Sequence, residues 1–270
     1  MGIFSDILLT VDYDRTLTAP DGSIPQRNLE AIRYFMENGG AFTVNTGRSV
    51  PMTKVFRDKV PVNAPLLLYN GSAAYDLSEK KLSFMHEIEM DMYTTVRELL
   101  ETFPRLTVEI QGIDAHYKFL PNPMWDAFSA SNDCAYATAE IGQDLGPFLK
   151  FTLYGEFHTE ILSDMFTGTP EEIAEMDTAE AMLKEKYADK VEVFRAAARI
   201  IDVHAKGVSK TAPPGSCSSG WAESGWSAWA TPIMTSPCWT ARIFPTFLPT
   251  QRWQNSMKMC AAAPTEQSRM

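Results

Sequence analysis

The sequence has few cysteines and no long hydrophobic run, and each absence argues against a class of protein. Its four cysteines in 270 residues show neither CxxC spacing nor a paired framework. This pattern argues against a disulfide-stabilised scaffold and against a structural zinc site. The longest apolar runs, such as Ile7 to Leu9, are far too short to cross a bilayer. We therefore expect neither a disulfide-rich secreted domain nor a membrane protein.

Basic residues are also scarce, which bears on the partners of the protein. There are 24 lysines and arginines against 34 aspartates and glutamates, and the net charge is −10. A nucleic-acid-binding surface needs a basic stripe to neutralise phosphates, so we expect no nucleic-acid partner. A small phosphorylated ligand remains compatible with this charge, because a few placed groups and a metal hold such ligands. No basic segment followed by an apolar stretch opens the chain, and we expect a cytoplasmic protein.

The N-terminal part of the chain alternates strand and helix signals. Short apolar runs at 7–11, 41–44 and 66–69 are separated by a helical pattern over 25–38 and by further polar segments. This alternation predicts an α/β domain with a doubly wound parallel sheet. Each run ends in polar residues accompanied by glycine or arginine. Because ligands bind outside the carboxyl ends of such strands, we expect these three ends to converge on one site.

An α+β insert interrupts this pattern between about residues 80 and 190. The apolar spacing predicts a helix over 92–103 and strands over 106–110 and 148–154. A second long helix follows, with Thr169 as its N-cap. Two further strands are predicted at 192–194 and 200–203.

The sharpest local feature is the segment DYDRTLT, which directly follows the first apolar strand. Asp12 and Asp14 lie two residues apart where this strand runs into a loop. One carboxylate can serve as nucleophile and metal ligand while the other donates a proton to the leaving group. A turn rich in aspartate and threonine is the alternative, since both residues favour loops.

Three further candidates follow later strands. Thr46 and Gly47 could cradle a phosphate with backbone NH groups, or could be an ordinary N-cap with a turn glycine. Asn70 could contact a phosphate at the end of the third strand. Alternatively, it could belong to an ordinary turn, because Asn-Gly is the commonest tight-turn dipeptide. Lys210 could neutralise charge on a transferring phosphoryl group, or could be a solvated surface lysine. The four histidines show no metal-ligand spacing, and we expect them to be structural or exposed.

Taken in order, DYDRTLT, NTGR, an NGS turn, an insert of about a hundred residues and GVSK resemble the Cof-type phosphatases (subfamily IIB) of the haloacid dehalogenase superfamily. The resemblance spans residues 5–210. It implies that Asp12 attacks phosphorus and forms an aspartyl-phosphate, and that Asp14 protonates the leaving oxygen and then activates water. It also implies that Thr46, Gly47 and Lys210 hold the phosphoryl group.

The same resemblance implies a magnesium ion held by the Asp12 carboxylate and the Asp14 main-chain carbonyl. Asn70 and Arg48 are weaker candidates for phosphate binding. The insert corresponds to the family's mobile cap of the C2 type, which covers the site. The expected function is magnesium-dependent hydrolysis of a small phosphorylated metabolite, either a sugar phosphate or a phosphorylated cofactor.

Two other functions remain open on the sequence. A phosphomannomutase-like phosphotransferase would pass the phosphoryl group to a second substrate oxygen instead of water. A non-catalytic protein that binds a phosphorylated ligand is the other. Arg15, which stands where most family members have glycine, keeps this reading open, and so does the missing fourth motif described next.

The family's fourth motif, GDxxND, is missing after Lys210. From there to the end the sequence contains no aspartate, holds five of the six tryptophans and shows no helical or strand period. Such a break in composition within a domain has no physical reason. It predicts a core sheet whose C-terminal part is disrupted and whose first strand is partly unpaired.

A shift of the reading frame by one nucleotide restores the motif. Tryptophan and methionine each have a single codon, so the bases at those positions are known. Joining the last base of such a codon to the first two bases of the following codon shows which residue the shifted frame encodes. Trp229 with the next codon must then give Gly, and Met234 and Trp239 with theirs must each give Asp. Neighbouring pairs permit the rest of GDxxNDxxMLD. We predict a frameshift at about Lys210, the alternative being a genuine but unusual tail.

The expected domain division follows from these patterns. The hydrolase core comprises 1–79 and 191–210, the cap comprises 80–190, and the aberrant tail comprises 211–270.

Overall fold

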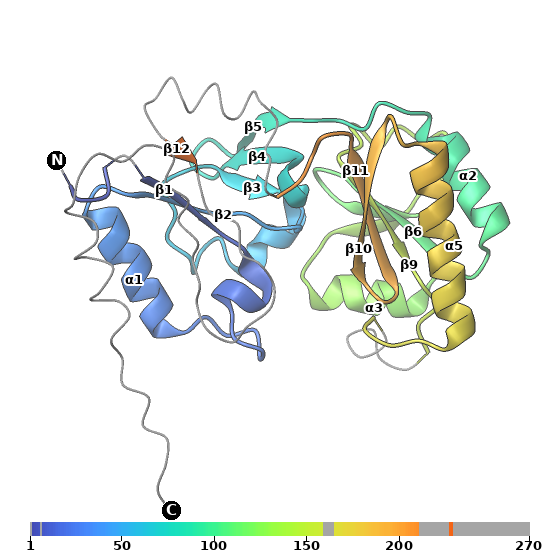
Figure 1. Ribbon diagram of the computed structural model, residues 1–270, viewed down its shortest axis with the longest axis horizontal. Helices are drawn as coiled ribbons and strands as arrows, with labels where there is room; N and C mark the ends of the chain where they lie inside the picture. The colour runs from blue at the N-terminus through green and yellow to red at the C-terminus, as the bar shows by residue number, and fades with distance from the viewer. Residues whose placement is uncertain (1, 6, 159–164, 211–226, 229–270) are drawn as a thin grey trace, which may run out of the picture.

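The computed structural model describes residues 2–5, 7–158 and 165–210 and the backbone of 227–228, which form two parts joined by two connections (Figure 1). The first part carries the N-terminal elements. Its elements are β1 (Ile7–Val11), η1 (Tyr13–Leu17), α1 (Gln26–Glu37), β2 (Ala41–Val44), η2 (Pro51–Val55), β3 (Leu66–Leu68), η3 (Tyr69–Gly71), β4 (Ala73–Asp76), β5 (Lys81–Met85) and β12 (Ser227–Ala228).

The sheet of this first part is parallel around β1. Strand β1 pairs in parallel with β2 on one side and with β12 on the other. An isolated parallel bridge from Asn45 to Leu67 extends the order to β3. Helix α1 buries Ile32 in the cluster that also contains Val11, Phe42 and Leu68. The helix ends before Gly39, whose φ of 91° is favourable for glycine and costly for other residues. We name this part the core.

The second part, the cap, is built on a six-stranded sheet of order β10-β11-β9-β6-β7-β8. All pairs are antiparallel except β7 with β8. Its elements are α2 (Met92–Thr102), β6 (Thr107–Gln111), β7 (His116–Lys118), α3 (Pro123–Ser131), β8 (Tyr136–Thr138), β9 (Lys150–Tyr154), α5 (Pro170–Lys186), β10 (Val191–Ala197) and β11 (Ile200–Ala205).

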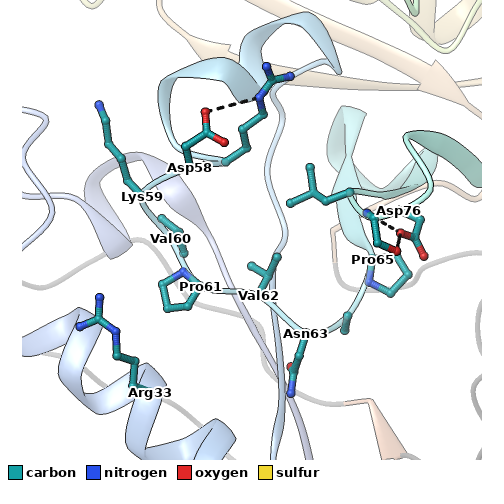
Figure 2. A pocket seen from close by; sticks show the side chains of 13 residues that line it. Arg33, Asp58, Lys59, Val60, Pro61, Val62, Asn63, Pro65 and Asp76 are labelled. Atoms are coloured by element: carbon teal, nitrogen blue, oxygen red, sulfur yellow. Dashed lines mark hydrogen bonds and ion pairs between the residues drawn. The ribbon is translucent and has the colours of Figure 1, made fainter.

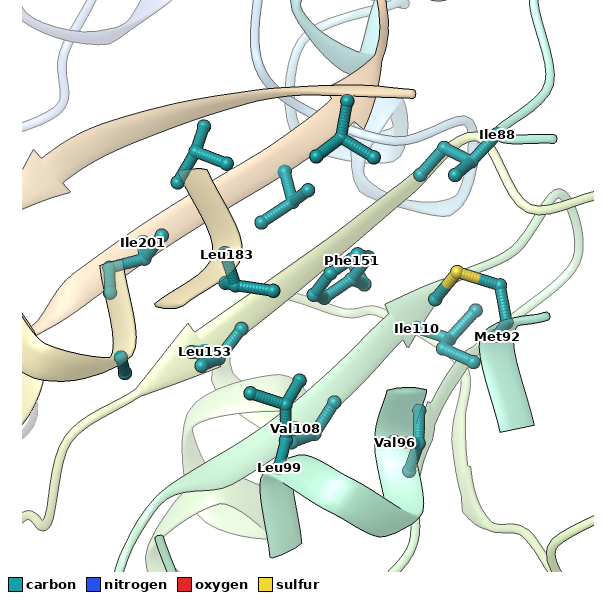
Figure 3. Packing of buried hydrophobic residues seen from close by; sticks show 14 of the residues in the cluster. Ile88, Met92, Val96, Leu99, Val108, Ile110, Phe151, Leu153, Leu183 and Ile201 are labelled. Carbon is teal, nitrogen blue, oxygen red and sulfur yellow. The ribbon is translucent and has the colours of Figure 1, made fainter. Parts of the chain in front are cut away.

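The two faces of the cap sheet differ in polarity because alternate residues of a strand point to opposite sides. One face is apolar and is covered by α2 and α5, whose Val96, Leu99 and Leu183 pack against Phe151 and Ile201 (Figure 3). The other face carries the intervening residues, which are polar and also buried: Glu109, Gln111, Lys150, Thr152, Asp202 and His204. A buried polar face needs partners, and the core supplies several of them, as described below.

The expected boundaries of the cap need correction at both ends. Strand β5 extends to residue 85 and pairs with β4, so the core continues past the expected limit of 79. Residues 191–205 were assigned to the core, but β10 and β11 pair with β9 in the cap sheet. Their period of two correctly predicts strands, yet a local period does not state which sheet a strand joins.

The tail lies almost entirely outside the described residues, and so does its predicted fourth motif. The backbone of β12 alone is described, and it pairs with Ile7 and Leu8 at the start of β1. The first strand therefore has a partner on this side at Ile7 and Leu8. No helix in the described part of the chain is long and apolar enough to span a membrane.

Candidate functional site

The structure brings together the polar ends of β1, β2 and β3 and the segment that re-enters the core after β11. Lys210 Nζ lies 2.7 Å from Asp12 Oδ1 although 198 residues separate them. Asn45 Nδ2 donates to the Lys210 carbonyl at 2.9 Å, and the Asn70 NH donates to the Thr46 carbonyl at 3.0 Å. The predicted convergence of the strand ends is thus found among the described residues.

Asp12 is a buried carboxylate at the end of β1. Burial raises its pKa, and the neighbouring Asp14 adds to this, whereas the Lys210 ammonium and the Tyr13 NH act in the opposite direction; the net pKa lies above the ordinary value for aspartate. The loop after it returns sharply, since the Leu17 NH donates to the Asp12 carbonyl at 3.1 Å. The only cation that directly pairs with this carboxylate within the described residues is Lys210.

Asp14 projects from the same loop and is half exposed. Arg48 binds both carboxylate oxygens of Asp14: Nε donates to Oδ2 and Nη2 donates to Oδ1, each at 2.9 Å. The guanidinium also lies over the Tyr13 ring, 5.2 Å from its centroid. Arg48 was expected as a weak phosphate ligand, and in this arrangement it positions the second carboxylate of the pair.

Thr46 and Gly47 form the turn after β2. Thr46 is buried, and its hydroxyl accepts from the Arg48 NH at 3.2 Å. A Cβ on Gly47 would lie 2.7 Å from Asn70 Oδ1, which is closer than real Cβ contacts. The Asn70 side chain on the loop after β3 therefore packs closely against this turn, and a larger residue at position 47 would push that side chain away.

Asn70 connects the loop after β3 to the cap. It occupies the left-handed region with φ of 57°, where asparagine is better tolerated than most residues. Its Nδ2 lies 3.1 Å from Asp202 Oδ2 and 3.0 Å from His204 Nε2. Asn70 was expected near the phosphate, and the structure adds a role at the boundary between core and cap.

Lys150 and Asp202 on the polar face of the cap were not anticipated from the sequence. Lys150 Nζ lies 2.9 Å from Asp202 Oδ2 and donates to the Gly47 carbonyl at 3.2 Å. Burial would raise the pKa of Asp202, but Lys150 and neighbouring donors bring it below its usual value. The alternating polar residues of 150–154 and 200–204 were the available signal. Their neighbours in space depend on strand pairing, which the sequence does not state.

His116 and His204 were expected to be structural or exposed, and both are buried on this polar face. His116 Nε2 lies 2.7 Å from Ser49 Oγ of the core, and its Nδ1 lies 3.3 Å from Glu109 Oε2. Burial alone would lower the pKa of His116, but Glu109 and Cys134 together raise it to about 9. Burial lowers the pKa of His204 to about 3 despite the nearby Asp202. At neutral pH one imidazole is therefore charged and the other neutral.

The oxygen atoms at the end of β1 suit a hard divalent cation. The Asp12 carboxylate and the main chain of Asp14 offer the carboxylate and carbonyl oxygens that magnesium prefers. Lys210 contacts one of the two Asp12 carboxylate oxygens, Oδ1, at 2.7 Å. The donor set therefore fits magnesium on this side of the site, while the expected fourth-motif aspartates fall outside the described residues.

A second cluster of possible ligands lies in the cap, away from the strand ends. Ligand atoms of Glu156, His158 and Glu172 lie within 4.8 Å of one another. Glu172 already accepts from Arg199 Nη2 at 2.7 Å and from the Thr169 NH at 2.7 Å. An arginine in direct contact opposes a metal ion there, and Glu172 is used in the capping box of α5.

A surface hollow of about 720 Å³ also lies in the core (Figure 2). Figure 2 shows Arg33 on α1 and Lys59, Pro61 and Asn63 on the segment before β3. None of the predicted site residues lines this hollow. The chemistry indicated by the sequence therefore belongs to the strand ends and not to this hollow.

Comparison with known proteins agrees with the geometry. The profile of the haloacid dehalogenase-like hydrolase family matches residues 9–212. No match is found among curated proteins.

Three solved structures with a similar fold illustrate the likeness. A haloacid dehalogenase-like hydrolase from Bacteroides thetaiotaomicron has a TM-score of 0.65 at 18% identity, covering 82% of this chain and 77% of that one. A HAD/Cof-like hydrolase from Plasmodium vivax has a TM-score of 0.61 at 20% identity, with 81% and 75% covered. A second B. thetaiotaomicron protein, described among phosphatases of the superfamily, has a TM-score of 0.55 at 16% identity, with 82% and 73% covered.

Proposed function

The chain belongs to the haloacid dehalogenase-like hydrolase family, and from this premise we propose that it is a magnesium-dependent phosphatase of small phosphorylated metabolites. The observation that carries the proposal is the buried Asp12 carboxylate 2.7 Å from the Lys210 ammonium, beside the Thr46 turn. A cation next to a buried nucleophile and a hydroxyl with backbone NH groups around it is an arrangement suited to a phosphoryl group.

In the proposed reaction, Asp12 attacks phosphorus in line with the leaving oxygen and forms an aspartyl-phosphate. Lys210 and the turn of Thr46 and Gly47 offset charge on the nonbridging oxygens. Asp14 gives a proton to the leaving oxygen and later takes one from the water that hydrolyses the intermediate. Magnesium, held by the Asp12 carboxylate and the Asp14 carbonyl, would supply further charge stabilisation on the phosphoryl oxygens.

The polar face of the cap supports a hydroxylated leaving group, as in a sugar phosphate. It carries Lys150, Asp202 and His204 within contact of the core loops. In the described part of the chain, Gln111 Oε1 and His204 Nδ1 are buried atoms of this face without a hydrogen-bond partner. Such atoms favour a ligand that brings its own donors and acceptors.

The test separates hydrolysis from phosphoryl transfer and from simple binding. A panel of phosphomonoesters is incubated with magnesium and with the chain both as written and with the predicted reading frame restored, and inorganic phosphate and sugar phosphate isomers are both measured. Phosphate release that Asp12→Asn abolishes supports the phosphatase. Conversion of a sugar 1-phosphate to its 6-phosphate without phosphate release would instead indicate a phosphotransferase. Ligand-induced stabilisation without turnover, retained in Asp12→Asn, would indicate a binding protein.

A further inference from the structure

Arg15 makes a contact that the proposed chemistry does not use. It lies between Asp14 and Thr16 in the loop after β1, and its guanidinium carbon is 4.5 Å from the centroid of the Phe166 ring. Phe166 belongs to the cap, and its side chain remains 48% exposed. Among the described residues, Arg15 forms no ion pair with any carboxylate. The contact thus joins the nucleophile loop of the core directly to the cap.

Both partners are held in place by their own backbones. Arg15 has φ of 58°, and its NH donates to Thr18 Oγ1 at 3.0 Å. On the cap side, the carbonyls that flank Phe166 both accept from Arg199: Met165 from its NH at 3.0 Å and Thr167 from its Nε at 2.6 Å. Because these backbones are already ordered, little entropy is lost when the two side chains meet.

The left-handed backbone conformation of Arg15 bears on why an arginine stands at this position. The left-handed region is unfavourable for a side chain such as arginine and readily accessible to glycine. The loop geometry alone would therefore be better served by glycine. An arginine at this position must act through its side chain, and the contact of that side chain in the structure is Phe166.

Besides an exposed ion pair of Lys54 with Asp133, most of the remaining contacts between core and cap lie on or beside the buried polar face. They include Lys150 with Gly47, Asn70 with Asp202, and Tyr69 Oη donating to the Gly112 carbonyl. In Figure 1 both connections between the two parts cross in the upper half of the view, whereas the loop after β1 lies in the lower half. A contact away from the connections restrains rotation of the cap more effectively than one beside them.

We propose that Arg15 and Phe166 form a latch that favours the closed cap and sets the loop of Asp12 and Asp14 against the closed site. Arg15 is a positioning residue in this scheme, and its part in turnover rests on the proposed phosphatase function. A cation–π contact at an exposed site changes an equilibrium by about two- to fivefold. Loss of the latch therefore raises the ratio of open to closed cap by that factor, and the apparent KM rises only in inverse proportion to the remaining closed fraction while kcat changes little.

Lys150 offers a measure of cap opening that does not depend on catalysis. It is 5% exposed and contacts the core, so opening exposes its amine. Lys118 is a matched control: it is 3% exposed, but its partner Asp126 lies in α3 of the same domain. Opening of the cap leaves Lys118 covered, whereas unfolding of the cap exposes both lysines.

The experiment measures acetylation rates of both lysines by mass spectrometry in the full chain. In Arg15→Gly and in Phe166→Leu, Lys150 should react about two- to fivefold faster while Lys118 is unchanged. Arg15→Lys, which keeps the cation, should stay near the parent rate. The double variant should be no faster than either single one, because both remove the same contact. Arg15→Gly should also leave the melting temperature equal or higher, since it relieves the backbone.

Three outcomes would overturn the latch. If the acetylation rate of Lys150 is unchanged in both single variants, the contact of Arg15 with Phe166 does not restrain opening of the cap. Equal acceleration at Lys118 assigns the effect to cap stability. If Arg15→Gly raises KM but Phe166→Leu does not, then Arg15 acts on the substrate anion and not on the cap. If the Lys150 acetylation rate changes as expected while the frame-restored chain hydrolyses no phosphomonoester, the latch stands and the proposed function fails.

Discussion

At the scale of the residue, the site depends on close packing between its loops as much as on the charges of its side chains. Asp12 is a candidate nucleophile because it is buried beside a lysine, and burial and the lysine act on it in opposite directions. Burial strengthens the electrostatic coupling between them, since the surroundings are less polarisable than water. The turn at Gly47 matters equally, because it fixes the distance between the loops after β2 and β3.

Gly47→Ala tests this steric requirement. The added Cβ would lie 2.7 Å from Asn70 Oδ1, so the Asn70 side chain must shift away from the phosphate turn. A displacement of this kind lowers kcat/KM by roughly 10- to 100-fold. Gly22→Ala is the control for a strained backbone away from the site: its φ of 80° disfavours alanine, nothing lies within 4 Å of a Cβ there, and it should lower stability but not kcat/KM. Initial rates on the best phosphomonoester would show the difference, and equal rates for the two variants would contradict the account of this turn.

Asp12, Thr46 and Lys210 were sequence candidates because each comes after a strand signal, directly or nearly so for Asp12 and Thr46 and five residues after β11 for Lys210. Lys150, Asp202 and His204 could not be predicted. They are ordinary polar residues of strands, and they reach the site only because β9 and β11 pair across about fifty residues of chain. Their alternation with apolar neighbours predicts two faces of a sheet. It does not predict that the core covers the polar one.

At the scale of the element, the N-terminal cap of α5 determines where this helix begins. Thr169 begins the helix, its hydroxyl accepts from the Glu172 NH, and Glu172 accepts from the Thr169 NH. The sequence predicts this start correctly, since Thr169 is followed by a proline at the first helical position. Strands β10 and β11 were also predicted as strands but assigned to the wrong sheet.

Thr169→Ala should therefore destabilise the cap by about 1 kcal/mol, because one NH at the helix start loses its acceptor. Thr178→Ala is the matched control on the exposed side of the same helix, where alanine is the better helix former. Urea unfolding followed by circular dichroism measures both. The capping account is contradicted if the control variant loses as much stability as Thr169→Ala.

At the scale of the whole molecule, the interface of core and cap carries two histidines of opposite charge state. The pKa of His116 is raised to about 9, so its stabilising contribution is present below about 6.5 and is lost as pH rises toward about 9. The pKa of His204 is lowered to about 3, so its neutral form contributes above about 6.5, and this contribution declines as pH falls toward about 3.

The free energy of unfolding should accordingly have its maximum near pH 6.5, with a decline on each side on the order of 1–3 kcal/mol from these groups. Urea titrations across pH 5 to about 9 measure it. His116→Gln should flatten the alkaline side selectively, and His204→Gln should flatten the acidic side. A decline on the alkaline side that persists in His116→Gln would contradict the assignment of that histidine.

We further propose that the reading frame changes at about Lys210. A gene with a compensating one-nucleotide change at this point should encode GDxxND and yield a more soluble protein, because the core sheet regains its C-terminal elements. Sequencing across the codons for 207–240 and intact mass test the proposal. A gene and a mass that agree with the tail as written would identify a genuine sequence and overturn it.

The most direct test of the central claim compares magnesium-dependent phosphate release by three proteins: the chain as written, the frame-restored chain and the frame-restored Asp12→Asn variant. The account predicts rapid release by the restored chain, weak or no release by the chain as written, and a loss of about a thousandfold or more in the Asp12→Asn variant. Release that survives in Asp12→Asn, or that is equal in the chain as written and the restored chain, would contradict it.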